Sequence, residues 1–303
     1  MKPNLTTSLC GLTLKNPLIM ASGTFGYGEE FSPYMDPSLL GGICSKGLTL
    51  QPKAGNYGER MWETPAGMLN SVGLQNPGVA HFIAQELTVM RKFDTAIIAN
   101  MGGGTEEDYI AGAALLNDAD IDMLELNISC PNVKEGGMAF GIKADVAYRL
   151  VNAVRKVYRG RMMVKLSPNA EDIVEMALAC QAAGADALSL INTLKGMVID
   201  VYARKPAFRG ISAGLSGPAI RPVALRMVYD VVGAVDVPVV GLGGIACARD
   251  VVEFIMAGAA AVQIGTANFI RPDISLEILR DLQVFMQEQG IAALDEIRGC
   301  AQL

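Results

Sequence analysis

The feature that most constrains this chain is a repeated alternation of a short apolar run, a break rich in glycine or asparagine, and an amphipathic helical pattern. The apolar run recurs eight times within 303 residues, and helical patterns lie between most of the runs. Short strands that alternate with helices form parallel βαβ units. Eight such units close into a barrel, whereas a doubly wound sheet has about five or six strands. The sequence therefore predicts an α/β fold of the (β/α)8 TIM-barrel type.

The expected strands and helices mostly alternate along the chain. The expected strands cover residues 17–21, 42–45, 95–99, 123–126, 162–166, 187–191, 238–240 and 261–264. The helical patterns cover residues 78–92, 105–117, 144–158, 170–183, 219–232, 248–257 and 275–289.

Two insertions interrupt this rhythm. Residues 47–77 and 194–218 are longer than ordinary strand-to-helix loops, and each follows the carboxyl end of a strand. Barrels place active sites at that face, so we expect the insertions to form hairpins and loops that roof a site. Residues 5–15 predict a hairpin that plugs the opposite end. Because no stretch has the composition of a linker, we expect residues 1–303 to form a single domain.

Composition and charge exclude several classes of protein. The net charge of −6 and the absence of a basic run argue against a nucleic-acid surface. We expect neither a signal peptide nor a membrane span, because no suitable apolar segment occurs, and a cytoplasmic location is the simplest expectation. The six cysteines are at least 34 residues apart. Metal and iron–sulfur sites normally use closely paired cysteines, so we expect no metal site in this chain.

Polar or small residues stand where each predicted strand ends. The carboxyl ends of parallel strands meet at one face of a barrel, so we expect these residues to line one polar mouth. In chain order they are Ser22 and Gly23, Lys46 and Gly47, Asn100, Asn127, Lys165, Asn192 and Thr193, Gly243 and Gly244, and Gly265 and Thr266.

The loops after the last two strands resemble a phosphate site. Residues 241–245 read GLGGI and residues 264–266 read IGT. Glycines let backbone N–H groups approach a phosphate, and barrels commonly bind phosphate at these two loops. The first loop also mimics the dinucleotide fingerprint. We reject that interpretation because no acidic residue follows about 20 positions later.

Lys165 lies in an apolar strand, where a charge is costly unless it is paired or functional. One interpretation is an interior ion pair with Glu125, which also lies on a strand. The other is that Lys165 faces a ligand that becomes negative, such as a reduced flavin.

Cys130 follows the fourth strand in the segment NISCPN, residues 127–132. A thiol titrates near pH 8.5, so it can serve as a base or a nucleophile. Most cysteines on loops are inert. Its place between two asparagines over the expected polar mouth favours a catalytic role for Cys130.

Taken together, these residues resemble the class 1 dihydroorotate dehydrogenases along essentially the whole chain. The motifs are NPLIMASG (16–23), SKG (45–47), NSVGLQN (70–76), ELNISCPN (125–132), VKLSP (164–168) and INT (191–193), with the two glycine loops. The resemblance implies oxidation of (S)-dihydroorotate to orotate in pyrimidine synthesis. Cys130 would remove a proton from C5 while a hydride leaves C6 for the flavin FMN.

The resemblance also implies two sets of binding residues. FMN would be held by Ser22, Lys46, Gly47, Asn100, Asn127, Lys165, Ile191, Gly217, Gly243, Gly244, Gly265 and Thr266. The substrate would be held by Lys46, Asn70, Ser71, Val72, Gly73, Leu74, Asn127, Asn192 and Thr193. The substrate carboxylate suits Lys46, and its amide edges suit asparagines, which both donate and accept.

Within class 1, residues 130–137 resemble subtype B. That resemblance implies a partner subunit that carries FAD and an iron–sulfur cluster and passes electrons to NAD. It also implies a homodimer of catalytic chains flanked by two such partners.

Two alternatives stay open at this stage. The FMN domain of a dihydropyrimidine dehydrogenase shares the barrel and a cysteine loop, but its uracil-type substrates lack the carboxylate. A barrel without redox chemistry, such as a phosphosugar isomerase or lyase or a binding protein, would explain the phosphate loops alone and would purify colourless.

Overall fold

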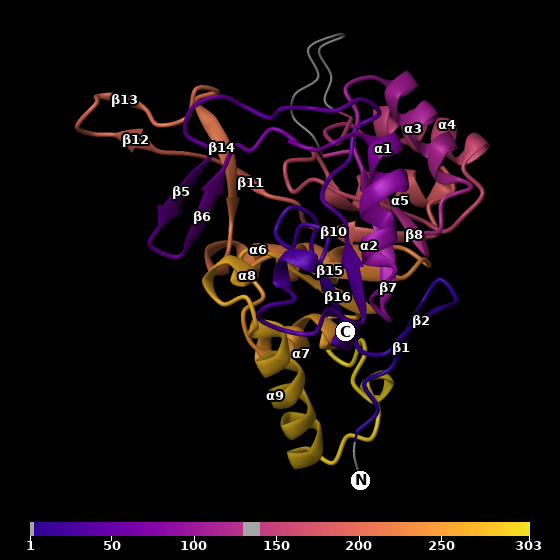
Figure 1. Ribbon diagram of the computed structural model, residues 1–303. Coiled ribbons are helices and arrows are strands. Elements are labelled where there is room, and N and C mark those ends of the chain that lie inside the picture. The colour runs from indigo at the N-terminus through magenta and orange to yellow at the C-terminus, as the bar shows by residue number, and fades with distance from the viewer. Residues whose placement is uncertain (1–2, 130–139) are drawn as a thin grey trace.

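Eight parallel strands pair side by side into a closed barrel in the computed structural model, which describes residues 3–129 and 140–303 (Figure 1). The strands follow one another around the barrel in chain order, and the last pairs with the first. They are β3 (Leu18–Met20), β4 (Gly42–Cys44), β7 (Ala96–Met101), β8 (Met123–Asn127), β9 (Met162–Lys165), β10 (Ala187–Leu190), β15 (Val239–Leu242) and β16 (Ala261–Ile264). Each coincides with one predicted strand, so the (β/α)8 prediction is confirmed.

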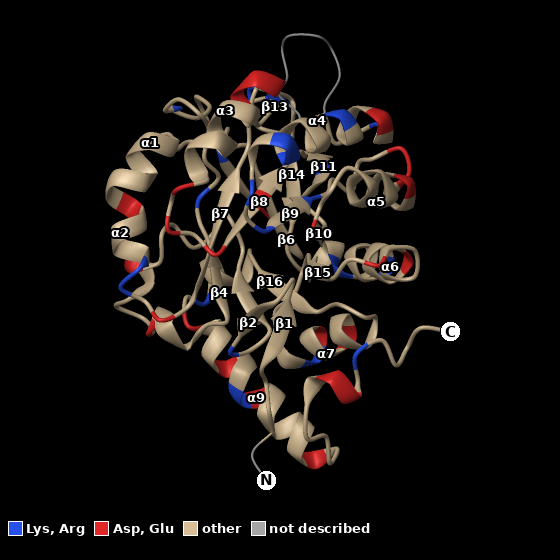
Figure 2. Ribbon diagram, turned by 90° about the vertical axis from the view of Figure 1, so that its right-hand side faces the viewer, with Lys and Arg blue, Asp and Glu red and all other residues tan. Residues whose placement is uncertain are grey.

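Helices surround the barrel on its outside (Figure 2). They are α1 (Val79–His81), α2 (Leu87–Met90), α3 (Glu106–Leu116), α4 (Ala144–Val157), α5 (Ile173–Ala182), α6 (Arg221–Val232), α7 (Ala248–Met256), α8 (Ala267–Ile270) and α9 (Ile274–Glu288). A π-helical stretch, Phe82–Glu86, links α1 to α2, where the sequence predicts one continuous helix. Short 3-10 helices, Glu29–Phe31 and Pro37–Leu39, replace a full helix between β3 and β4, while Pro218–Ile220 and Leu294–Glu296 are 3-10 turns elsewhere.

Local chemistry fixes where the helices begin and which face they bury. The Thr105 side chain accepts a hydrogen bond from Asp108 N at the start of α3, and Asp172 caps α5 in the same way. In α4 the buried residues include Val146, Leu150 and Val154, which recur every four positions and so share one face. That face packs into the apolar layer between helices and barrel. No helix among the described residues is long and apolar enough to cross a membrane.

The amino-terminal face of the barrel, here called the floor, is closed by a hairpin of β1 (Thr7–Leu9) and β2 (Leu12–Leu14). Leu9 and Leu14 are buried against inward side chains of the barrel, among them Ile98 and Met163. Thr7 Oγ1 also donates to Ala260 O at 2.8 Å. The predicted plug is therefore confirmed.

Both ends of the described chain are tied to the floor. Asn4 N donates to Ala292 O at 2.8 Å. Near the other end, Gln302 Nε2 donates to Tyr229 O and Ala257 O, where α6 and α7 end.

The two insertions combine above the opposite face, here called the mouth. β5 (Met61–Thr64) and β6 (Gly67–Asn70) come from the first insertion, and β11 (Leu194–Met197) and β14 (Ser212–Ser216) come from the second. They form one four-stranded antiparallel sheet in the order β11-β14-β6-β5, the roof sheet, with β12 (Ile199–Asp200) and β13 (Lys205–Pro206) as a small hairpin beside it (Figure 1). The sequence predicts hairpins here, but it does not predict that they share a sheet.

The packing of the floor hairpin against the barrel can be tested by mutation. Replacing Leu9 with alanine removes a fully buried side chain, so the free energy of unfolding should fall by about 2–5 kcal/mol. Urea unfolding followed by circular dichroism measures the change. Leu115→Ala on the exposed face of α3 is the matched control and should stay within about 0.5 kcal/mol. Equal effects for the two variants would contradict a packed plug.

Candidate active site

A cavity of 1170 Å³ opens at the mouth, between the barrel strand ends and the roof sheet. Most of the predicted site residues line it. From the predicted cofactor set these are Ser22, Lys46, Gly47, Asn127, Lys165, Ile191, Gly217, Gly243, Gly244, Gly265 and Thr266, and from the predicted substrate set Asn70, Ser71, Val72, Gly73, Leu74, Asn192 and Thr193. Asn100 does not line the cavity and is fully buried beneath it. Residues spread over most of the chain thus gather at one site.

The turns after β15 and β16 form one corner of the cavity. Gly243 and Gly244 have φ angles of 129° and 74°, a region that residues with a Cβ rarely adopt. A Cβ on Gly244 would also lie 2.8 Å from Gly217 O. Within residues 3–129 and 140–303, the backbone N–H groups of Gly243, Gly244, Gly265 and Thr266 donate to no acceptor. Such a group of free donors suits a phosphate.

The Asp250 side chain holds the backbone of this corner by hydrogen bonds. Asp250 Oδ2 accepts hydrogen bonds from Ala246 N at 2.8 Å and Cys247 N at 3.2 Å. Its Oδ1 pairs with Arg221 Nη1 at 2.7 Å, and the same nitrogen lies 2.6 Å from Glu253 Oε2. The turn after β15 is therefore fixed to both α6 and α7 before any ligand arrives.

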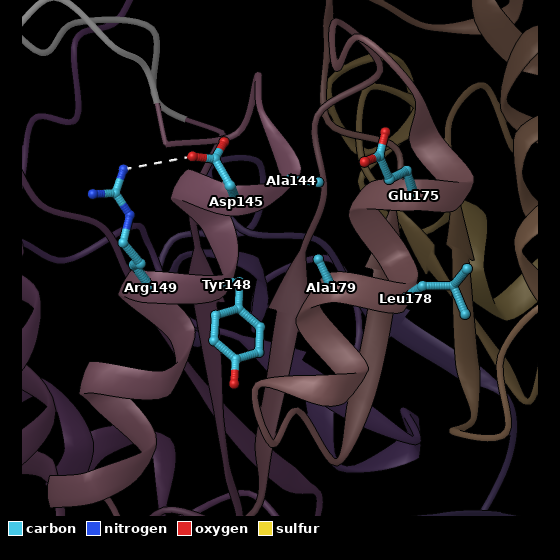
Figure 3. Close-up of a pocket in the computed structure, with 7 residues that line it drawn as sticks. All are labelled: Ala144, Asp145, Tyr148, Arg149, Glu175, Leu178 and Ala179. Carbon is cyan, nitrogen blue, oxygen red and sulfur yellow. Dashed lines mark ion pairs between the residues drawn. The ribbon is translucent and has the colours of Figure 1, made fainter.

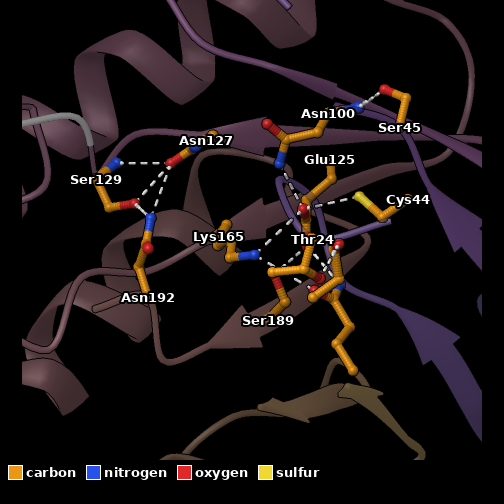
Figure 4. Close-up of polar contacts among 12 residues, drawn as sticks. Thr24, Cys44, Ser45, Asn100, Glu125, Asn127, Ser129, Lys165, Ser189 and Asn192 are labelled. Atoms are coloured by element: carbon orange, nitrogen blue, oxygen red, sulfur yellow. Dashed lines mark hydrogen bonds and ion pairs between the residues drawn. The ribbon is translucent and has the colours of Figure 1, made fainter. Parts of the chain in front are cut away.

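Lys165 lines the cavity and is nearly fully buried. Its Nζ is 3.7 Å from Glu125 Oε2 and donates to Gln263 Oε1 at 3.3 Å (Figure 4). The ion pair with Glu125 is therefore confirmed, and Lys165 also lines the cavity. The interpretation that Lys165 faces a ligand that becomes negative stays a prediction.

Glu125 is held by donors from four other barrel strands. Ser189 Oγ and Gln263 Nε2 donate to its Oε1 at 2.8 and 2.6 Å. Asn100 Nδ2 and Cys44 Sγ donate to its Oε2 at 2.5 and 3.1 Å (Figure 4).

Charge and hydrogen bonds decide the protonation states in this network. Burial opposes ionisation of Glu125, but the Lys165 charge and the hydrogen bonds together hold its pKa below the ordinary value. Burial and the neighbouring carboxylate raise the pKa of the Cys44 thiol well above its usual range. Cys44 is therefore a neutral donor, as expected for a core cysteine.

Lys46 is the second cation at the cavity wall. Its ammonium has neither a hydrogen-bond nor an ion-pair partner among the residues that the structure describes. Burial is the main factor that lowers its pKa; Arg60 lowers it further and Glu30 partly opposes the shift. A half-buried cation without a partner favours an anionic ligand beside it.

Amide and hydroxyl groups converge on the other side of the cavity. Asn127 Oδ1 accepts from Ser129 Oγ at 2.6 Å and from Asn192 Nδ2 at 3.4 Å (Figure 4). Asn192 Nδ2 also donates to Ser129 Oγ, and Asn192 Oδ1 accepts from Thr193 N at 2.8 Å. These contacts align donors and acceptors that a planar heterocycle with amide edges can use.

Asn70 ends roof strand β6, and residues 71–74 continue from it along the cavity. Gly73 and Leu74 have positive φ angles of 78° and 53°. Asn76 holds this bend, because its Nδ2 donates to Leu74 O at 2.7 Å and to Thr49 Oγ1 at 2.8 Å. The backbone of the predicted substrate loop therefore holds its bend without a bound ligand.

Cys130 lies outside the described residues, as do residues 131–139. Ser129, the residue before it, lines the cavity. The assignment of Cys130 as a base stays a prediction.

Several residues that were not predicted from the sequence line the same cavity, including Gln263, Ser167, Asn169, Lys195 and Arg209. Gln263 carried a signal, since it is a single amide within the apolar strand β16. Ser167 and Asn169 directly follow β9, so their position at a strand end was a signal as well. Lys195 and Arg209 come from the second insertion, whose position over the mouth depends on its pairing with the first.

A second hollow, of 690 Å³, lies on the outer surface between α4 and α5 (Figure 3). Its lining includes Tyr148, Leu178 and the ion pair of Arg149 with Asp145 at 3.8 Å. No predicted site residue lines it, so the mouth cavity is the candidate active site.

The donors in the mouth cavity fit a phosphorylated flavin. Free backbone N–H groups at the glycine corner suit the phosphate, and the Lys165 cation suits a ring that gains negative charge on reduction. The volume slightly exceeds the usual range of about 300–1,000 Å³ for ligand pockets, so a cofactor and a small substrate fit together.

Comparison with known proteins finds one family that matches nearly the whole chain. A family model described as dihydroorotate dehydrogenase matches residues 4–286. Three bacterial relatives share the name "dihydroorotate dehydrogenase B (NAD(+)), catalytic subunit". The Petrotoga mobilis protein is 55% identical, with 96% of this chain and 97% of the relative covered. The Alkaliphilus metalliredigens protein is 51% identical, with 98% and 99% covered, and the Pelobacter propionicus protein is 50% identical over the full length of both.

The buried ion pair predicts a pH-dependent stability. The pKa of Glu125 is lower in the folded chain than in the unfolded chain. Its ionised form therefore stabilises the fold above the unfolded pKa, and this contribution is lost as pH falls through the folded pKa. Lys165→Met leaves the carboxylate unpaired and should lower the free energy of unfolding by about 3–5 kcal/mol at pH 7.

The deficit of Lys165→Met relative to the parent should shrink toward pH 4, because protonation then neutralises Glu125 in the variant. Urea unfolding at both pH values measures it. Lys92→Met, at an exposed lysine, is the control and should change little. A deficit independent of pH would contradict the charge-based explanation.

Proposed function

The chain belongs to the dihydroorotate dehydrogenase family, and from that premise we propose that it oxidises (S)-dihydroorotate to orotate in de novo pyrimidine biosynthesis. In this proposal residues 1–303 form one FMN-binding domain. The unpartnered Lys46 ammonium carries the argument, because it lies in the wall of the same cavity as the amide cluster of Asn127 and Asn192. A planar amide ring bearing a carboxylate matches both features.

The FMN site combines the glycine corner with Lys165 and Lys46, the two cations that line the cavity. The free N–H groups of Gly243, Gly244, Gly265 and Thr266 would bind the phosphate. Lys165 would lie beside the ring, where its charge favours the reduced form. Further contacts would come from Ser22, Lys46, Gly47, Asn127, Ile191 and Gly217, whereas Asn100, which is buried beneath the cavity, would act through its hydrogen bond to Glu125. When bound, FMN supplies an acceptor for the hydride that leaves C6 of dihydroorotate.

The substrate residues orient the ring and its carboxylate. Lys46 would bind the carboxylate, while Asn70, Asn127, Asn192 and Thr193 would satisfy the amide edges and residues 71–74 would cover one side. The preformed bend at Gly73 and Leu74 limits the conformational entropy lost on binding.

Cys130 would act as the general base. Its thiolate would take the proton from C5, and the C–H electron pair would form the C5–C6 double bond as the hydride departs from C6. In total, dihydroorotate loses one proton and one hydride and becomes orotate. Ser129 and Asn127, which precede Cys130 in the chain, line the cavity, and this supports the assignment.

The relatives' shared name supports a partner and an acceptor, because it describes an NAD(+)-linked enzyme and a catalytic subunit. We extend this to the chain as the proposal that two catalytic chains form a dimer with two partner subunits. Each partner would carry FAD and an iron–sulfur cluster and would transfer electrons to NAD.

The visible spectrum tests cofactor and substrate together. The purified protein should be yellow, and anaerobic dihydroorotate should bleach the oxidised-flavin absorbance. Dihydrouracil, which lacks the carboxylate that Lys46 would bind, is the matched control and should leave the spectrum unchanged. A colourless protein would contradict the FMN site. Bleaching by dihydrouracil alone would instead support a dihydropyrimidine dehydrogenase activity.

A variant at Cys130 tests the base. Cys130→Ala should retain FMN and its spectrum but lose turnover by about 10²–10⁴-fold, the usual contribution of general base catalysis. Steady-state assays with an artificial acceptor measure the loss. Cys300→Ala, at an exposed cysteine near the end of the chain, should keep full turnover. Near-normal turnover of Cys130→Ala at neutral pH would refute the assignment.

A further inference from the structure

Glu125 is the carboxylate at the centre of the barrel, and no ligand in the cavity can touch it. The residue is fully buried and does not line the cavity, whereas its partners Lys165 and Gln263 do. Any influence of Glu125 on a bound ligand must therefore pass through other side chains.

Lys165 is the side chain through which Glu125 can most directly affect a bound ligand. Glu125 lies on β8, and its neighbour Lys165 lies on β9 at a distance of 3.7 Å between Nζ and Oε2. Gln263, from β16, donates to Glu125 and accepts from Lys165, so it contacts both members of the pair. The lysine is thus held between two strands that are not neighbours in the barrel.

The remaining donors fix the carboxylate itself. Cys44, Asn100 and Ser189 come from β4, β7 and β10 and fill positions around its two oxygens. Together with β8, β9 and β16, six of the eight barrel strands contribute to one charge pair. Hydrogen bonds from this many rigid elements leave the carboxylate a single position.

We propose that Glu125 is a positioning residue that keeps the Lys165 ammonium charged and directed at the cavity, and thereby sets the reduction potential of the bound flavin. This inference rests on the proposed FMN function. It assigns Glu125 no contact with cofactor or substrate.

The sign of the effect follows from the burial of Lys165. A buried ammonium without a carboxylate partner is strongly disfavoured. After Glu125→Gln, Lys165 could keep its charge only by leaving this position, or keep its position only by losing its proton. Either change removes a cation that stabilises the reduced flavin, so the potential should become more negative.

The test measures the potential of bound FMN by stepwise reduction with dithionite against a reference dye. Glu125→Gln should shift it to more negative values, equivalent to at least about a tenfold loss in the preference for reduced over oxidised FMN. Lys165→Met should shift it in the same direction. The double variant should shift it no further than Lys165→Met, because both changes act on one cation.

Two further variants distinguish an effect on the position of Lys165 from a general loss of stability. Ser189→Ala removes one hydrogen bond from the same carboxylate but leaves the charge pair, so it should lower the melting temperature and leave the potential near that of the parent. Glu125→Asp retains the charge and should keep the potential near that of the parent. If Glu125→Gln does not fold, the double variant, which removes both charges, replaces it and should match Lys165→Met.

Three results would overturn the inference. They are an unchanged potential in Glu125→Gln, a more positive one, or a shift that persists undiminished in the Lys165→Met background. A parent protein that is colourless, or yellow but not bleached by dihydroorotate, contradicts the proposed function instead. Because dithionite replaces the substrate, the potential is measured independently of the substrate assignment.

Discussion

Eight parallel strands share one carboxyl-terminal face, so every residue that follows a strand arrives at the same rim. The cavity, the glycine corner and the amide cluster all depend on this constraint. It also explains why residues as distant in sequence as Ser22 and Thr266 line one site. The opposite face needs no chemistry and is sealed with leucines from the floor hairpin.

The sequence predicted most of this rim because the relevant signal is local. A short apolar run followed by a polar or small residue marks a strand end wherever it occurs, and Asn127 and Lys165 could be placed by this rule alone. The glycines at 243 and 244 were equally visible, since the turn after β15 requires positive φ angles. Membership of the family, carried by the same residues, added the expected roles.

The features that escaped prediction depend on contacts between distant segments. The roof sheet requires Gly214 of the second insertion to pair with Asn70 of the first, and nothing in either segment specifies that register. The convergence of Cys44, Ser189 and Gln263 on Glu125 likewise depends on the barrel's closure. The π-helical stretch at 82–86 interrupts a helix whose apolar spacing looks continuous. The role of Cys130 still rests on sequence, because that residue lies outside the described part of the chain.

The attachment of both chain ends to the floor has a practical consequence. Asn4 is tied to Ala292, and Gln302 is tied to the ends of α6 and α7, while the roof sheet stands at the other end of the molecule (Figure 1). An affinity tag or a fused reporter domain on either end would emerge on the side away from the roof sheet. Protein immobilised through such a tag would present its open mouth to solution, so ligand entry could be followed on a surface without obstruction by the attachment.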